Sequence, residues 1–154
     1  ALGLGAAWFL EWKTTDLVWS LWLGSLVLGY LTILGTIFGA AWVGGHGIFN
    51  SDFPSAQRLA AVAAGIGAGL FLLGFFTLHF GGFHAGHAVF LSSFFPLEGM
   101  QENAFSNSFT NPLELVRLVG ELVLPVYGAF LLPALIAERN HVFAPLMEAK
   151  KAVG

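Results

Sequence analysis

The sequence contains no cysteine, which excludes a disulfide framework, a thiolate metal site and an iron–sulfur cluster. Charge is scarce as well, because Lys, Arg, Asp and Glu make up only 10% of the 154 residues, against roughly 25% in soluble domains. Six residues are basic and the net charge is −3. This balance argues against nucleic-acid binding, which needs a basic face.

Familiar catalytic signatures are also missing. The glycine-rich runs lie in apolar segments with no Lys-Ser or Lys-Thr pair directly after them, so no phosphate-binding loop is predicted. Neither His-Glu-x-x-His nor Gly-x-Ser-x-Gly occurs. Conventional hydrolase or kinase chemistry is therefore unsupported, and whether the chain is an enzyme stays open. No basic region precedes the first apolar stretch, so we expect no signal peptide.

The sequence is instead rich in long runs of apolar residues. Hydrophobic residues make up 56% of the chain, more than a soluble fold could hide, so the natural solvent is a lipid bilayer. Three apolar runs predict transmembrane helices near residues 17–43, 67–94 and 113–137, because roughly 20 residues suffice to cross the hydrocarbon. We expect an all-α integral membrane bundle that forms a single domain over residues 1–154.

The edges of these runs carry interfacial and capping signals. Residues 1–10 are typical of a segment that lies at the level of the lipid headgroups, and residues 14–16 of a helix N-cap. Residues 138–154 predict a polar C-terminal helix. Aromatic belts are indicated near the ends of the first run by Trp19, Trp22 and Trp42.

The second apolar block is too long for a single upright span. Residues 57–95 would reach nearly 60 Å as a straight helix, about twice the thickness of the hydrocarbon. The early part could protrude, the helix could tilt strongly, or the Gly81-Gly82 pair could break it into a span and a re-entrant piece. We favour one span with a helical extension before it, and therefore three spans, with four as the alternative.

Turn residues mark the connections. Residues 44–54 and 96–111 predict loops by their Gly, Asn, Asp and Pro content. Asn111 followed by Pro112 fits a cap and a first helical position. Pro125 and Pro133 should kink the third run or free backbone carbonyls. By the positive-inside rule, the basic residues on the side of the first loop place the C-terminus in the cytoplasm and the 96–111 loop outside.

Small residues four apart recur in the apolar runs and let membrane helices approach closely. The alternative is that glycine is simply commoner in membrane helices. The pairs are Ser20/Gly24, Gly35/Gly39, Gly65/Gly69 and Gly82/Gly86.

Three histidines lie in the second apolar block: His79, His84 and His87. At 100° per residue, His84 lies at about 140° and His87 at about 80° from His79, so the three share one side of a helix. His84 and His87 could chelate one ion together, whereas His79 lies roughly 12 Å from His87 along the axis. Alternatively, the imidazoles bind helix carbonyls or waters and hold the bundle together.

Glu121 is the natural partner of these histidines if the third span faces the second. A carboxylate in a membrane needs a cation, a metal or a proton, and Arg117 and Glu114 share its helix face. Imidazole and carboxylate suit zinc, iron or copper, and imidazole alone suits the axial position of a haem or a chlorophyll-type ring. We therefore predict a metal or cofactor site at His79, His84, His87 and Glu121, with neutralisation of Glu121 by Arg117 as the alternative.

The run His79-Phe80-Gly81-Gly82-Phe83, followed by His87 and Phe90, resembles a family of bacterial multi-spanning membrane proteins known only as a domain of unknown function. The shared pattern is histidine, aromatic, glycine and phenylalanine, with a second histidine eight residues after the first. The resemblance covers about a third of the chain. It implies a multi-spanning topology in a bacterial inner membrane and directs attention to two of the histidines, without implying an activity.

Two functions follow as hypotheses. The first is a small integral membrane subunit that packs within a larger or homo-oligomeric complex, because the glycine spacing favours helix contacts and the helices are too few to enclose a pathway. The second is a metal- or tetrapyrrole-binding membrane protein, active in redox chemistry or transport, that uses the His/Glu cluster.

Overall fold

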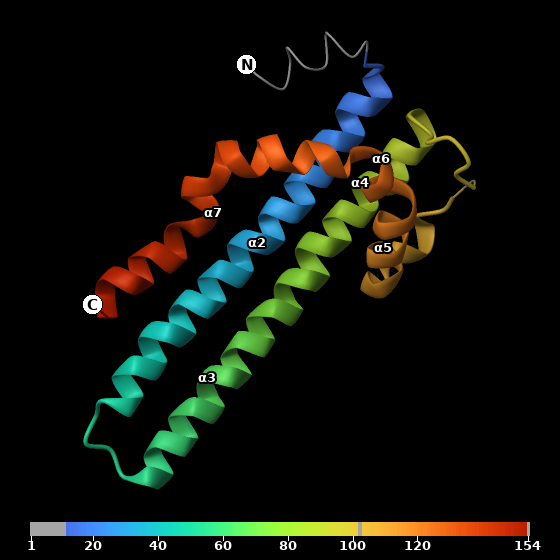
Figure 1. The fold of residues 1–154 in the computed structure, drawn as a ribbon. Coiled ribbons are helices and arrows are strands. Elements are labelled where there is room, and N and C mark those ends of the chain that lie inside the picture. The colour runs from blue at the N-terminus through green and yellow to red at the C-terminus, as the bar shows by residue number, and fades with distance from the viewer. Residues whose placement is uncertain (1–11, 102, 154) are drawn as a thin grey trace. The chain divides into compact units, whose positions relative to one another are not determined.

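The protein is all-α, as the apolar runs predict. A computed structural model describes residues 12–101 and 103–153, and in this part of the chain every regular element is helical (Figure 1). Three continuous helical stretches are long and apolar enough to cross a membrane. The predicted interfacial segment at residues 1–10 lies outside the described residues. The three helical stretches are Thr14–Phe49, Ser55–Phe94 and Pro112–Val153.

The first stretch is the single helix α2 (Thr14–Phe49). Asp16 lies in its first turn and accepts a hydrogen bond of 2.9 Å from the backbone N–H of Lys13, which satisfies a donor that the helix leaves unpaired. The helix continues six residues beyond the predicted end of the span, through glycines that sequence reasoning assigned to a loop. The predicted loop therefore shortens to residues 50–54.

The second stretch is continuous and shows no break at Gly81-Gly82. Helix α3 (Ser55–Phe76) runs into a π-helical turn, η1 (Thr77–Gly81), and on into α4 (Gly82–Phe94). The two glycines thus sit at the exit from a wider turn of helix, and the alternative of four spans is not what the fold adopts. The expected helical extension before the span stays a prediction, because helix continuity fits a protruding extension and a tilted helix equally.

The third stretch is segmented around its prolines, as predicted. Helix α5 (Pro112–Leu118) begins at an N-cap whose side chain accepts from two backbone N–H groups, so the predicted Asn111 cap is confirmed. A π-helical turn η3 (Val119–Val123), α6 (Leu124–Tyr127) and a 3₁₀ turn η4 (Gly128–Phe130) follow, before α7 (Leu131–Val153). Figure 1 shows the chain changing direction at α6, next to a proline that cannot donate a helical hydrogen bond.

The chain divides into two compact units. Unit 1 takes in the chain up to Leu28 together with Thr77–Ala137, and unit 2 takes in Gly29–Phe76 together with Glu138–Gly154. The loop before α5 belongs to unit 1 and contains a short 3₁₀ helix, η2 (Ser106–Phe109). Most of the buried hydrophobic side chains lie in unit 1.

In unit 2, α2 and α7 touch at backbone level. A Cβ added to Gly35 would lie 3.3 Å from the carbonyl oxygen of Val142, and one added to Gly39 would lie 2.9 Å from that of Pro145. The Gly35/Gly39 pair therefore lets two helices approach closely, as predicted for small residues four positions apart. By contrast, a Cβ at Gly24 or Gly65 would meet nothing within 4 Å among the described residues.

Replacing Gly39 by alanine is expected to destabilise the protein. The new methyl group would lie too close to the Pro145 carbonyl oxygen, so the backbone of α2 or α7 must shift, and overpacking of this kind costs about 1–3 kcal/mol. The loss should appear as a lower midpoint of thermal unfolding, followed by circular dichroism of the purified protein in detergent.

Gly44→Ala is the matched control, because this position is helical and a Cβ there would meet nothing within 4 Å. Its unfolding midpoint should stay level or rise, since alanine is favoured over glycine in a helix by about 0.5–1 kcal/mol. Equal midpoints for G39A and G44A would show that the α2–α7 contact is not tight.

Candidate functional site

The core of unit 1 is built around two tryptophans near the start of α2. Trp19 and Trp22 are 0% and 6% exposed, and they lie edge to face with ring centroids 5.4 Å apart. Phe105, from the loop before α5, packs against Trp19 at 5.6 Å and is itself fully buried. Sequence reasoning assigned both tryptophans to an aromatic belt; that prediction is wrong, because they face the protein interior.

Each tryptophan also donates a hydrogen bond to a backbone carbonyl of the α4 region. The Trp19 Nε1–H donates to the carbonyl oxygen of Phe95 at 2.8 Å, and the Trp22 Nε1–H donates to that of His84 at 3.1 Å. Phe95 is the C-cap of α4, where carbonyls lack partners within the helix. Trp19 therefore caps α4 from another helix, and both bonds fix α4 against the first turns of α2.

His84 is the one predicted site residue that lies inside this core, at 4% exposure. Its Nδ1 lies 3.0 Å from the carbonyl oxygen of Phe80. A carbonyl only accepts, so Nδ1 carries the proton and Nε2 presents a lone pair. The hydroxyl of Ser25 lies 3.3 Å from Nε2 and donates to it. The alternative that a histidine binds a helix carbonyl and ties the bundle together is thus correct for His84.

The carbonyl that His84 binds belongs to the π-helical turn η1. Phe80 lies four residues before His84, and the two rings are in contact with centroids 4.2 Å apart. A π turn widens the helix and disturbs its regular hydrogen-bond ladder, and such turns are frequent at functional sites. Here the turn ends at Gly81, which is buried.

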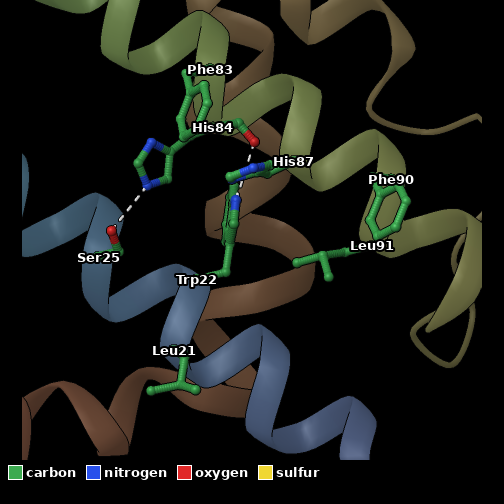
Figure 2. A pocket seen from close by; sticks show the side chains of 8 residues that line it. All are labelled: Leu21, Trp22, Ser25, Phe83, His84, His87, Phe90 and Leu91. Atoms are coloured by element: carbon green, nitrogen blue, oxygen red, sulfur yellow. Dashed lines mark hydrogen bonds between the residues drawn. The ribbon is translucent and has the colours of Figure 1, made fainter.

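His87 lies one turn further along α4 and lines the same groove as His84 (Figure 2). It is exposed, its ring packs on Phe83 with centroids 4.2 Å apart, and its centroid is 6.4 Å from that of His84. Among the described residues it has no hydrogen-bond partner. Both histidines line a groove of about 410 Å³ whose other walls are Leu21, Trp22, Ser25, Phe83, Phe90 and Leu91.

The remaining predicted residues lie elsewhere. His79 is exposed and does not line the groove. Glu121 is exposed and pairs with Arg117 at 2.6 Å, and the same guanidinium pairs with Glu114 at 2.6 Å. The alternative that Arg117 neutralises Glu121 is therefore what the structure shows. In residues 12–101 and 103–153, no three His, Asp or Glu side chains form a group that could hold a metal ion.

Two further polar residues of unit 1 make a contact that the sequence did not predict. Asp16 caps α2 through one carboxylate oxygen, and through the other it accepts a 2.9 Å hydrogen bond from the hydroxyl of Tyr127 in α6. Tyr127 is buried. The pair thus ties the start of α2 to the region of the Pro125 bend, and no local sequence pattern links residues 111 positions apart.

These features define a small membrane protein built from three apolar helical stretches. Residues 1–137 match the model of a family described as "Family of unknown function (DUF6498)", and the chain belongs to this family. The expectation of an uncharacterised family is confirmed at that level, while the shared motif and the bacterial multi-spanning character stay predictions. No curated protein and no solved structure matches the chain significantly.

Trp19→Phe should destabilise unit 1. Phenylalanine removes the Nε1–H that binds the part-buried Phe95 carbonyl, and an acceptor left unpaired costs about 1–3 kcal/mol. Phenylalanine also lacks the pyrrole ring of the fully buried indole, so a small void adds to the loss. We expect a lower unfolding midpoint and faster amide hydrogen exchange at the C-terminal turn of α4.

Trp42→Phe provides the comparison, because Trp42 is 64% exposed. It should leave both the midpoint and the exchange of α4 unchanged. Equal behaviour of W19F and W42F would mean that the indole of Trp19 does not cap α4.

Proposed function

We propose that this chain is a small integral membrane subunit that packs within a larger or homo-oligomeric membrane complex. Its three apolar helical stretches are the parts that a bilayer would surround. The positive-inside prediction orients the C-terminus toward the cytoplasm, and the family resemblance favours a bacterial inner membrane. We propose that another protein subunit, as well as lipid, covers part of these helices.

The observation that supports a partner is the charged triad Glu114–Arg117–Glu121. Its side chains form ion pairs on the surface of an apolar stretch, and those of Arg117 and Glu121 are more than half exposed. Glu121 lies nine residues into the stretch, about 13 Å from its start along a helix axis. Charges at such a depth face protein or water far more often than acyl chains.

The triad also indicates what kind of surface would cover it. One guanidinium between two carboxylates leaves a net charge of −1, so a partner that supplies a cation or a hydrogen-bond donor would complete it. Exposed apolar side chains flank the charges, among them Leu113 and Val116. This combination of an apolar surround and a polar centre is typical of helix contacts in membranes, where polar residues hold helices together.

The proposal predicts a contact at α5 that crosslinking can detect. A photo-crosslinking amino acid at Val116, which is 68% exposed and adjacent to Arg117, should give adducts of discrete mass in native membranes. Glu121→Gln should reduce their yield several-fold, because the partner group loses its charged counterpart. Glu148→Gln, which breaks another exposed pair, with Lys151 in α7, should leave the yield unchanged. Adducts to lipid alone at Val116 would contradict the proposal.

A second candidate function is supported by His84 and the groove beside it. A metal-binding histidine commonly donates one ring N–H to a backbone carbonyl and turns its other nitrogen to the metal. The Nδ1 of His84 makes such a bond to Phe80, and His84 and the unpartnered ring of His87 line the same apolar groove. The Nε2 of His84 accepts from the Ser25 hydroxyl, so a metal ion would take the place of that hydrogen bond. A metal ion or a tetrapyrrole held by these two histidines is therefore the alternative to a purely structural subunit.

Metal analysis and an optical spectrum of the purified protein distinguish the two candidates. Stoichiometric metal or a Soret-type band, lost in a His84→Ala/His87→Ala double variant and retained in His141→Ala, would favour the cofactor. A colourless and metal-free protein, expressed with iron, copper, zinc and haem precursor supplied, would remove this candidate. Circular dichroism of the double variant checks that it still folds.

A further inference from the structure

A second groove lies in unit 2, between α2 and α7. Its volume is about 540 Å³, within the range of ligand-binding clefts. Each helix contributes one face to it, since the lining residues are three or four positions apart on both. They are Phe38, Ala41 and Trp42 from α2, and Leu146, Ala149 and Lys150 from α7.

The groove is a consequence of the close approach of the two helices. Gly39 meets the backbone at Pro145, and a Cβ on Gly39 would lie 3.4 Å from the Cβ of Ala149. Ala149 is buried. Small residues therefore occupy the point of contact, and the larger Phe38, Trp42 and Leu146 line the groove beside it. A slot of this shape suits a flexible hydrocarbon chain.

The polar groups of the groove lack partners within the described part of the chain. Lys150 forms no ion pair there, whereas the next residue, Lys151, pairs with Glu148 at 2.7 Å. The indole N–H of Trp42 has no acceptor either, and the ring is exposed. The groove thus offers one ammonium group and one N–H donor beside an apolar slot.

We propose that this groove binds an anionic phospholipid. Its acyl chain would lie along Phe38, Trp42 and Leu146, and its phosphate would accept from the ammonium of Lys150. Lys150 is three residues from the end of α7, and terminal lysines and tryptophans are the groups that sit at headgroup level. A basic pocket between membrane helices is a suitable site for an acidic headgroup. This proposal is independent of the subunit function and of the histidine groove.

Native mass spectrometry tests it with phosphatidylglycerol and phosphatidylcholine that carry the same acyl chains. Each lipid is titrated into the full-length protein in detergent, and the fraction of protein with one bound lipid is measured. The wild-type protein should retain phosphatidylglycerol more tightly. Lys150→Gln should lower that affinity about fivefold, the effect expected for one cation near an anionic membrane surface, without changing the affinity for phosphatidylcholine.

Lys151→Gln is the matched control, because it removes an adjacent charge that is already paired. It should bind phosphatidylglycerol as the wild type does. Ala41→Phe tests the slot, since the exposed Ala41 lines the groove and a ring there should weaken binding of both lipids. The proposal is overturned if the wild type shows no preference for phosphatidylglycerol, if K150Q and K151Q behave alike, or if A41F binds both lipids normally.

Discussion

Hydrocarbon offers no hydrogen bonds, so a membrane helix must find partners for its polar groups inside the protein. The core of unit 1 is organised by this requirement. Trp19 and Trp22 each donate to a carbonyl of the α4 region, and His84 donates to the carbonyl of Phe80. These polar side chains act mainly on backbone rather than on one another. They fix α4 against α2, and each ring N–H finds its acceptor within the protein.

The same requirement distinguishes polar groups that are fully paired within the protein from those that still lack a partner. His84 is fully engaged, and Asp16 is shared between the start of α2 and Tyr127. His87, Lys150 and the net charge of the Glu114–Arg117–Glu121 triad are different, because the described part of the chain leaves each incompletely matched. Each of the three calls for a different complement: an acceptor or metal, a phosphate, and a cation.

The features that the sequence predicts well depend on local chemistry. Apolar length identifies the three stretches, and the Asn111-Pro112 cap and the proline interruptions follow from backbone geometry. The extent of α2 was underestimated because three glycines near its end (Gly44, Gly45 and Gly47), which favour a turn in water, are tolerated in membrane helices. The face shared by His84 and His87 was also predictable, since 100° per residue holds within α4.

The site as a whole was not predictable, because its partners come from distant positions. The burial of Trp19 and Trp22 could have been inferred, since with Leu23 and Leu26 they repeat at intervals typical of a buried helix face. The exclusion of Glu121 from the histidines could not, because it depends on how α5 is rotated. No sequence pattern predicts a π turn, and η1 changes the relation of His79 to the residues after it.

That turn has a consequence for chain length. A π turn accommodates one more residue than a regular helical turn would, so Thr77–Gly81 works as a spacer between two helices of fixed phase. Removing one residue from it would restore a regular helical turn and leave α4 nearly in its present phase, so His84 would still face the tryptophans. A deletion inside α4 itself, before His84, would instead rotate the residues beyond it by about 100°. The wider turn is thus the one place in this stretch where the helix can lose a residue and keep its buried face.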